Sequence, residues 1–399
     1  MQNQKLWTRD FVFVCLSSFF LFMTFYMLAV TLPIYVKEDL GGGEQDIGLT
    51  ITVFIISTIL LRPLAGKWID QYNPRKLVLF ALALFFSCTV MYLGVQSLLA
   101  LLLLRFIHGI GFGSATTMTG AMAIQLIPDS RKGEGVGYFG LCMSLAMVLG
   151  PFIGLVVLEH LSYSFVLYVC ILFSFLSFLF GVNVQTPNRV PQPKGEQLTG
   201  WKSYIEPKAI PIALTGLMLA FSYCTIATFI SVYAKEIGLS SSASYFFVVF
   251  AAVIILSRPL TGKLLDRQGE HVLVYPGILL FSIGMVALSQ VESITTFLFS
   301  GAIVGLGFGA LLPCFQTIAI KAAPKHRGGL ATGTFFLFFD TGYGLGSYIL
   351  GLIAGKTSYH TMFLIAGLTA FSTLVLYYLL HHKPAAAPMR RSIEKMANK

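Results

Sequence analysis

Asp340 is the only carboxylate well inside any long apolar stretch of the chain, in Phe336–Gly344 (FLFFDTGYG). A charge in such a stretch is costly and is usually kept for a function. Because the ionised form is disfavoured among phenylalanines, this carboxyl group could take up a proton on one side of a membrane and release it on the other. Tyr343 follows at i+3 on the same helical face, so its phenol could bind beside Asp340. The alternative is a carboxylate satisfied by an arginine or by hydrogen bonds at a helix end.

Arg105 and His108 form a second candidate site in another apolar stretch, Leu104–Gly109 (LRFIHG). A buried arginine is a candidate for coupling or for binding a negatively charged substrate. The alternative is that Arg105 hydrogen-bonds to helix carbonyl groups. A histidine can titrate near neutral pH, but for His108 neutral packing against a neighbour is the favoured interpretation.

The chain contains an internal repeat. The segment Arg62–Asp70 (RPLAGKWID) recurs as Arg258–Asp266 (RPLTGKLLD), and the same offset of 196 residues maps Gly109–Gly113 onto Gly305–Gly309. Two homologous halves in an apolar chain are typical of a transporter whose binding site lies where the halves meet.

The two candidate sites break this repeat. At the same offset Asp340 corresponds to Ser144 and Arg105 to Gly301. Residues shared by both halves describe the scaffold, so a charge present in one half only is the better candidate for coupling or substrate binding.

The elements that must position these residues are membrane-spanning helices. The chain is 56% apolar and 11% charged, with a mean hydropathy of +0.79, whereas soluble domains are about 25% charged. A spanning helix needs about 20 mostly apolar residues. Twelve segments qualify: 11–34, 46–66, 77–95, 98–122, 136–158, 162–184, 209–234, 243–262, 272–290, 294–320, 331–355 and 359–381.

The predicted fold is an all-α integral membrane protein with two pseudo-symmetric six-helix bundles. The N-terminal bundle is 1–184, a proline-rich cytoplasmic linker is 185–208, the C-terminal bundle is 209–381, and 382–399 is a basic cytoplasmic tail. The first span is too long for a signal-peptide core and no cleavage site follows it, so it is expected to remain.

The basic residues predict the orientation. Of 27 Lys and Arg, 21 fall on the side that holds both termini, 3 on the other side and 3 within spans, which makes the termini cytoplasmic in a cell membrane. The net charge of +10 therefore suits a face next to anionic lipid and does not call for nucleic acid. The six cysteines all lie within spans, which predicts packing roles and neither a disulfide framework nor a metal site.

The repeated segments carry a motif. Gly66 and Asp70 are followed by Arg75 and Lys76, and in the second half Gly262 and Asp266 are followed by Arg267. This pattern resembles the cytoplasmic-loop signature of the major facilitator superfamily, Gly-x3-Asp-Arg-x-Gly-Arg-Arg. Gln71 and Asn73 depart from it in the first half, and Glu270 and His271 replace the basic pair in the second. The resemblance implies that the motif closes an inner gate; the alternative is a pair of surface charges that end a helix.

Two further motifs are similar to that family. Arg105-x3-Gly109 resembles its fourth-helix motif, in which a buried arginine influences proton transfer, with His108 where glutamine is more usual. The fifth span resembles the antiporter motif of exporters, with the small residues and proline Gly137, Ala146, Gly150, Pro151 and Gly154. The first span lacks the acid found in many proton-coupled drug exporters, and this shifts the coupling role to Asp340.

The sequence therefore predicts a secondary transporter of the twelve-helix, proton-coupled drug or metabolite exporter branch. Its partners would be protons, a small amphipathic substrate and the lipid bilayer, with one chain as the functional unit and no cofactor. The alternatives are a proton-symport importer of a nutrient or organic anion, with Arg105 as ligand, and a non-transporting receptor. An enzyme is not expected, because a second intramembrane aspartate, a nucleophile–base cluster and a phosphate-binding loop are all missing from the sequence.

Overall fold

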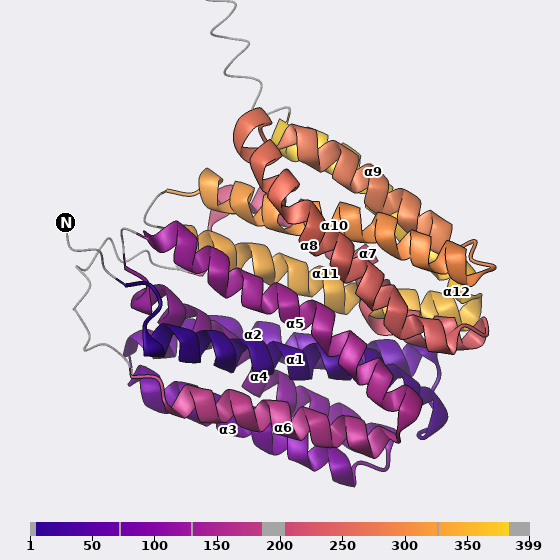
Figure 1. The fold of residues 1–399 in the computed structure, drawn as a ribbon, viewed down its shortest axis with the longest axis horizontal. Helices are drawn as coiled ribbons and strands as arrows, with labels where there is room; N and C mark the ends of the chain where they lie inside the picture. The colour runs from indigo at the N-terminus through magenta and orange to yellow at the C-terminus, as the bar shows by residue number, and fades with distance from the viewer. Residues whose placement is uncertain (1–4, 72, 129–130, 186–203, 325–326, 383–399) are drawn as a thin grey trace, which may run out of the picture. The chain divides into compact units, whose positions relative to one another are not determined.

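The computed structural model describes residues 5–71, 73–128, 131–185, 204–324 and 327–382, and within them the chain folds into long α-helices (Figure 1). Twelve of these helices are long and apolar enough to cross a membrane, so the predicted twelve-span all-α fold is confirmed. The long helices are α1 (Arg9–Glu38), α2 (Glu44–Gln71), α3 (Pro74–Met91), α4 (Leu98–Leu126), α5 (Lys132–His160), α6 (Tyr163–Val182), α7 (Ile210–Glu236), α8 (Ala243–Gln268), α9 (His271–Leu288), α10 (Ile294–Ala322), α11 (Gly328–Lys356) and α12 (Tyr359–Tyr377).

Short helical turns extend or precede these helices. Among the described residues they are η1 (Tyr92–Gly94), η4 (Pro207–Ala209), η5 (Ser240–Ser242) and the π-helical turn η7 (Tyr378–His382). Serine caps recur with the repeat. The hydroxyl of Ser97 accepts the Ala100 N–H at the start of α4, and Ser293 accepts the Thr296 N–H at the start of α10.

The repeat is visible in glycine contacts between helices. A Cβ on Gly109 of α4 would lie 2.3 Å from the Phe54 carbonyl oxygen of α2. The equivalent Cβ on Gly305 of α10 would lie 2.7 Å from the Phe250 carbonyl oxygen of α8. Close backbone approach through small residues is a common way to pack helices in a membrane, where water does not drive association.

The aromatic core repeats as well. The rings of Phe85 and Phe112 have centroids 6.1 Å apart at an interplanar angle of 38°. Phe281 and Phe308, each 196 residues later, give the same 6.1 Å and 38°. The two halves therefore share a packing scheme as well as a sequence pattern.

The described residues form two compact units. One contains residues 5–185 together with 226–247, and the other contains 204–225 together with 248–382. The second part of α7 and the start of α8 thus pack with the first unit. In that unit α1 packs against α5 and α6, and α4 packs against α2 and α3; in the other, α9 packs against α10 and α12.

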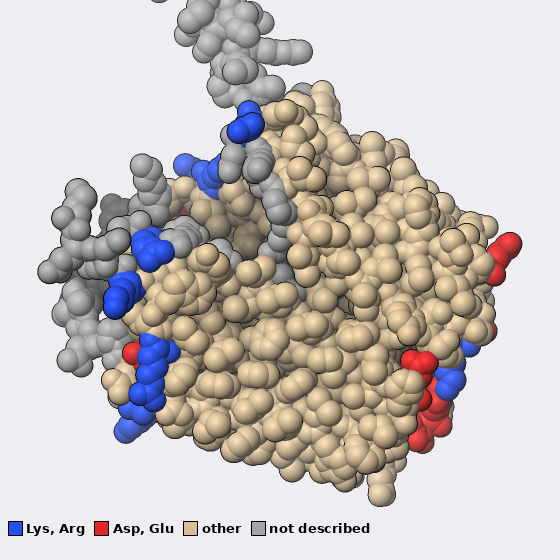
Figure 2. Space-filling view, in the orientation of Figure 1, with Lys and Arg blue, Asp and Glu red and all other residues tan. Residues whose placement is uncertain are grey.

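The flanks of the helices carry few charges. On the face shown in Figure 2, the Lys, Arg, Asp and Glu side chains lie toward the helix ends, and the surface between them carries no charged side chains. Large apolar side chains are exposed along such flanks, including Phe80 (70%), Leu99 (68%) and Leu256 (74%). A protein in water rarely exposes so much apolar surface, whereas lipid tails solvate it.

Candidate functional site

A buried polar cluster surrounds Arg105 in the first unit, and we call its five members the Arg105 cluster. α2 supplies Thr50, α3 and η1 supply Thr89 and Tyr92, and α4 supplies Arg105 and His108. Arg105 and His108 are fully buried, and Tyr92 is 3% exposed. The cluster thus joins three consecutive helices of the first unit.

Hydrogen bonds connect the cluster in a chain. Arg105 donates from Nε to the Thr50 carbonyl oxygen (3.2 Å) and from Nη1 to the Tyr92 hydroxyl (3.5 Å). The Tyr92 hydroxyl lies 3.0 Å from Nδ1 of His108, and Nε2 of His108 lies 3.4 Å from the Thr89 hydroxyl. Backbone bonding was one alternative predicted for Arg105, and the bond to the Thr50 carbonyl oxygen is of that kind.

Aromatic rings enclose the two ionisable side chains. The guanidinium carbon of Arg105 lies 4.1 Å from the centroid of the Phe54 ring, a cation–π contact. The His108 ring lies 4.3 Å from the Phe85 ring, centroid to centroid. No ion pair recorded for the described residues includes Arg105, so carbonyl, hydroxyl and aromatic groups solvate its charge.

The Arg105 cluster has no counterpart in the second half. The residues 196 positions later are Phe246, Met285, Leu288, Gly301 and Val304, all apolar. The glycines and phenylalanines around the cluster do repeat. The shared scaffold therefore packs well without these polar groups. Because burying them in a membrane is costly, we expect them to serve a function.

Asp340 and Tyr343 lie on α11 in the second unit. Asp340 is half-buried and its Oδ2 atom is fully buried. Tyr343 is buried (6% exposed), and its ring lies 6.3 Å from that of Tyr223 on α7, which in turn stacks on Phe308 at 4.0 Å. The structure therefore describes the two predicted ionisable sites in different units.

The small residues of the antiporter-like motif face α1. A Cβ on Gly150 would lie 2.9 Å from Cβ of Tyr26, and a Cβ on Gly154 would lie 2.8 Å from Cγ of Met27. Ala146 is buried and Pro151 lies inside α5; Gly137 also lies in α5, at a position outside the described side chains.

The equivalent face of α11 packs on α7 in the second unit. A Cβ on Gly342 would lie 2.1 Å from the Leu217 carbonyl oxygen, and a Cβ on Gly346 would lie 2.5 Å from that of Phe221. Gly342 and Gly346 follow Ala146 and Gly150 by 196 residues. Close helix approach at this level is therefore a property of both halves.

The Gly-x3-Asp motifs lie at the ends of α2 and α8. Gly66, Asp70, Gly262 and Asp266 fall in these helices, but their side chains are outside the described residues, so their gate role stays a prediction. Arg267 is exposed in the last turn of α8.

The residues after the first motif organise the start of α3. Asn73, which departs from the family pattern, is the N-cap, and its side-chain oxygen accepts the backbone N–H groups of Arg75 (3.0 Å) and Lys76 (3.4 Å). Both basic side chains are exposed, and Nη2 of Arg75 donates to the Val182 carbonyl oxygen at the end of α6 (3.2 Å).

Glu270 and His271, the other departure from the family pattern, bind the end of the last helix. His271 Nδ1 lies 2.8 Å from the Tyr377 hydroxyl, and His381 Nε2 lies 3.4 Å from Glu270. Partial burial alone raises the pKa of Glu270, but hydrogen bonds from its own backbone N–H and from His381 outweigh this, and the pKa lies below its ordinary value. In place of a basic pair, the two residues thus link the start of α9 to the end of α12 and to η7.

A buried ion pair, which sequence analysis did not identify, lies where the linker meets α7. Nη1 of Arg327 is 2.8 Å from Oε2 of Glu206, and the Glu206 side chain is 2% exposed. The Glu206 N–H donates to the Thr334 hydroxyl of α11 (2.8 Å), and Oε1 accepts the Lys208 N–H (3.2 Å). The available signal was the position of Glu206, which follows Asp10 by 196 residues just as Arg327 follows Arg131.

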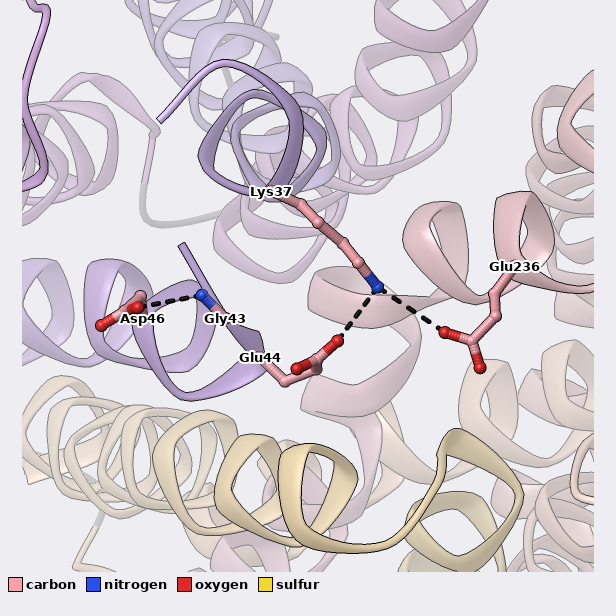
Figure 3. A network of polar contacts seen from close by, with 5 residues as sticks. All are labelled: Lys37, Gly43, Glu44, Asp46 and Glu236. Atoms are coloured by element: carbon pink, nitrogen blue, oxygen red, sulfur yellow. Dashed lines mark hydrogen bonds and ion pairs between the residues drawn. The ribbon is translucent and has the colours of Figure 1, made fainter. Parts of the chain in front are cut away.

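A second group of charged residues lies in the first unit, at the end of α1, the start of α2 and the end of α7. It consists of Lys37, Glu44 and Glu236, and we call it the Lys37 cluster. Figure 3 shows Nζ of Lys37 between the carboxylates of Glu44 (3.0 Å) and Glu236 (3.6 Å). Nearby, Asp46 accepts the Gly43 N–H (2.9 Å) at the start of α2.

Two other contacts support the same α1–α7 junction. Lys235 forms an ion pair with Glu38, and the buried Ser231 hydroxyl donates to the Val30 carbonyl oxygen (2.8 Å). The junction therefore combines exposed ion pairs with a buried hydrogen bond.

No group of three or more His, Cys, Asp and Glu side chains in the described part of the chain could hold a metal ion. All six cysteines are free thiols. Twelve apolar spans, an internal repeat and ionisable groups buried within spans together define a secondary transporter.

Comparison with known proteins agrees with this class. The family model of the Major Facilitator Superfamily matches residues 14–291 and 273–396, and the chain belongs to this superfamily. The family consists of transporters and not of enzymes, and their substrates are small molecules.

Individual relatives are distant. An uncharacterized MFS-type transporter of Pseudomonas aeruginosa is 27% identical over 395 residues, which cover 94% of each chain. The multidrug resistance protein MdtG of Klebsiella pneumoniae is 24% identical over 404 residues, covering 97% of this chain and 98% of MdtG. Among solved structures, the human organic anion transporter MFSD10 superposes with a TM-score of 0.72 at 14% identity, covering 92% of this chain and 98% of MFSD10.

Proposed function

We propose that this protein exports a small amphipathic compound from the cytoplasm in exchange for protons, and that Asp340 carries the proton. The observation that carries the proposal is a carboxyl group with a fully buried oxygen inside a span, at a position where the other half has serine. Burial in the membrane disfavours the ionised form of such a group, so the carboxylate readily takes up a proton. Its protonated and deprotonated states can then be tied to two conformations of the transporter.

Export is supported by two further observations. The fifth span resembles the antiporter motif of exporters, and its residues Gly150 and Gly154 lie against α1. A multidrug resistance protein is similar over nearly the whole chain. In this proposal the protein lies in the cell membrane with both termini in the cytoplasm, and one chain is the functional unit.

The mechanism follows from the repeat. The two six-helix halves rock about a midplane site, so that the site opens to one side at a time. Deprotonated Asp340 attracts a cationic or polar part of the substrate, and protonation releases it, with Tyr343 one turn away as a hydrogen-bonding neighbour. The Gly-x3-Asp motifs hold the cytoplasmic side closed in the outward-open state.

The test is proton flux in proteoliposomes of known orientation with a preformed pH gradient. A panel of cationic, neutral and anionic compounds is added to wild type, Asp340→Asn and Asp340→Glu. A compound that collapses the gradient with wild type and with the glutamate variant, but not with the asparagine variant, supports the proposal and identifies the substrate's charge class. Normal coupling in Asp340→Asn would remove Asp340 from the mechanism.

One observation favours a second function, proton-driven uptake of an organic anion. Nη2 of Arg105 is buried and has no hydrogen-bond partner among the described residues, while a guanidinium group stays charged at all physiological pH values. A carboxylate could satisfy this donor, and MFSD10, with a similar fold, is an organic anion transporter. In the same assay, accumulation of an anion along the proton gradient would establish uptake and make Arg105 the residue to test.

A further inference from the structure

We propose that His108 is a second proton-binding group, and that the contact between Arg105 and Tyr92 controls whether His108 can accept a proton. The inference deepens the proposed proton coupling and rests on it. It assigns Tyr92 the role of a positioning residue, which acts through His108 and touches no substrate.

The hydrogen positions in the cluster follow from its one obligatory donor. Arginine cannot accept a hydrogen bond, so the Tyr92 oxygen accepts from Nη1 of Arg105. The Tyr92 hydroxyl proton then points to the nearest acceptor, Nδ1 of His108, at 3.0 Å. Nδ1 therefore carries no proton in this arrangement.

The other ring nitrogen is assigned in the same way. The Thr89 hydroxyl donates its single proton to the Phe85 carbonyl oxygen at 2.8 Å. Its oxygen is then the acceptor for Nε2 of His108 at 3.4 Å, so the ring proton lies on Nε2. The network thus holds His108 as the neutral Nε2–H tautomer, with both ring nitrogens engaged.

Protonation of His108 is incompatible with this network. A proton added to the Nδ1 lone pair turns Nδ1 into a donor that faces the Tyr92 oxygen. Nη1 of Arg105 already points at that oxygen, so two fully buried cations would share one hydroxyl. The repulsion is relieved when Arg105 leaves Tyr92. Proton binding at His108 and the Arg105–Tyr92 contact therefore exclude each other.

The neighbouring helices offer no carboxylate to lessen this repulsion among the described residues. α2 contributes Thr50 and Phe54, neither of which titrates. The titratable or charged groups that interact with Tyr92, His108 or Arg105 are Cys88, Cys170 and Tyr163. None of them is anionic at neutral pH when buried, so the position of Arg105 controls the electrostatics of His108.

A displaced Arg105 also affects the helices. Its Nε bonds the carbonyl oxygen of Thr50 on α2, while Nη1 reaches Tyr92 just beyond α3. Loss of either contact loosens the link between these helices at α4. Binding of a proton is in this way tied to a local rearrangement, which a group that simply titrates would not produce.

The direct test is the tautomer of His108 in protein with ¹⁵N-labelled histidine, held in lipid nanodiscs near neutral pH. The His108→Gln variant, which retains a polar side chain, identifies the His108 signals among those of seven histidines. Wild type is expected to show a neutral ring protonated on Nε2. A neutral ring protonated on Nδ1, or an imidazolium, would overturn the inference. This measurement does not depend on transport, so it can fail or succeed independently of the proposed export.

The functional test is the pH profile of transport for Tyr92→Phe, with Tyr163→Phe as the matched control. Both changes remove one buried tyrosine hydroxyl, but only that of Tyr92 bonds His108. Loss of the Tyr92 donor removes support for the neutral ring, so the midpoint of the profile is expected to move to higher pH. The midpoint should stay in place in Tyr163→Phe, and in Tyr92→Phe combined with His108→Gln.

The outcomes of the pH experiment separate positioning from structure. A lower rate at every pH with an unchanged midpoint in Tyr92→Phe would mean that Tyr92 only packs. An equal midpoint shift with and without His108 would place the proton elsewhere and refute the inference.

Discussion

Gly342 lies where α11 meets α7, and a Cβ there would come within 2.1 Å of the Leu217 carbonyl oxygen. Gly333 lies on the same helix, where a Cβ would meet no atom within 4 Å. Gly342→Ala should therefore destabilise the protein by about 1–3 kcal/mol through overpacking. Gly333→Ala should be neutral or stabilise by up to about 1 kcal/mol, because alanine favours a helix.

The measurement is the thermal unfolding midpoint of both variants in one detergent. The contact is with the backbone of Leu217, which cannot move aside as a flexible side chain could. An unchanged midpoint for Gly342→Ala would show that α7 and α11 do not approach this closely in the membrane protein.

Single residues of the candidate site differed in how well the sequence predicted them. Arg105, His108 and Asp340 were identified because a charge or imidazole is rare in an apolar stretch. Tyr92 was missed because a tyrosine near the end of a span is ordinary at a membrane interface. Thr89 was missed because hydroxyls that bond their own helix are common in spans.

The repeat contained a signal for the missed residues. Thr89 and Tyr92 correspond to Met285 and Leu288 at the 196-residue offset. A polar residue whose counterpart is apolar marks a place where one half departs from the scaffold. That comparison of halves would have identified the cluster, although not its hydrogen bonds, which join residues 13 to 55 positions apart.

At the scale of elements, the ion pair between Glu206 and Arg327 fastens the segment before α7 to the start of α11. Both partners lie at helix ends, and the Glu206 carboxylate is 2% exposed. Glu206→Gln removes the buried charge of this ion pair, and breaking a buried pair typically costs about 3–5 kcal/mol. The unfolding midpoint should fall clearly.

The control for this prediction is Glu292→Gln, an equal change at an exposed position between α9 and α10. Its midpoint should stay within error of wild type. Equal midpoints for the two variants would mean that the Glu206–Arg327 pair is open to water in the membrane.

The helices themselves were predictable because each span is a long apolar run. Most helices run past the predicted segment at one or both ends, whereas α3, α6, α9 and α12 end two to four residues before it. α2, for example, runs from Glu44 to Gln71 where 46–66 was expected. The helix continues past the apolar run because the polar residues at the membrane surface keep their helical backbone hydrogen bonds. Glu206 was not predicted because the linker composition around it suggested an irregular connection.

At the scale of the whole molecule, the Lys37 cluster ties the end of α7 to those of α1 and α2. Its side chains are 22–48% exposed, so each ion pair contributes at most about 1 kcal/mol. Lys37→Gln should therefore open the junction more often without unfolding it. A cysteine at the buried Ser231 reports this opening through its rate of reaction with a maleimide in nanodiscs.

The expected result is a roughly two- to five-fold faster reaction at Ser231→Cys when Lys37→Gln is added. Lys356→Gln, at an exposed lysine at the end of α11, is the matched control and should leave the rate unchanged. High salt should reduce the difference, because it screens exposed ion pairs. Identical rates in all variants would show that the ion pairs of Lys37 do not hold this junction closed.

The one-sided Arg105 cluster also bears on how such a chain arises by gene duplication. In a complex of two identical subunits each substitution occurs twice, so such a complex would hold two buried guanidinium groups or none. A single chain that contains both repeats is not restricted in this way. One copy could then carry the charge while the other kept glycine at the same place, and both could still inherit the glycine contacts and phenylalanine packing that make the helices fit. A chain with two repeats can therefore keep the same helix packing in both halves and place a buried charge in only one, which a homodimer cannot do.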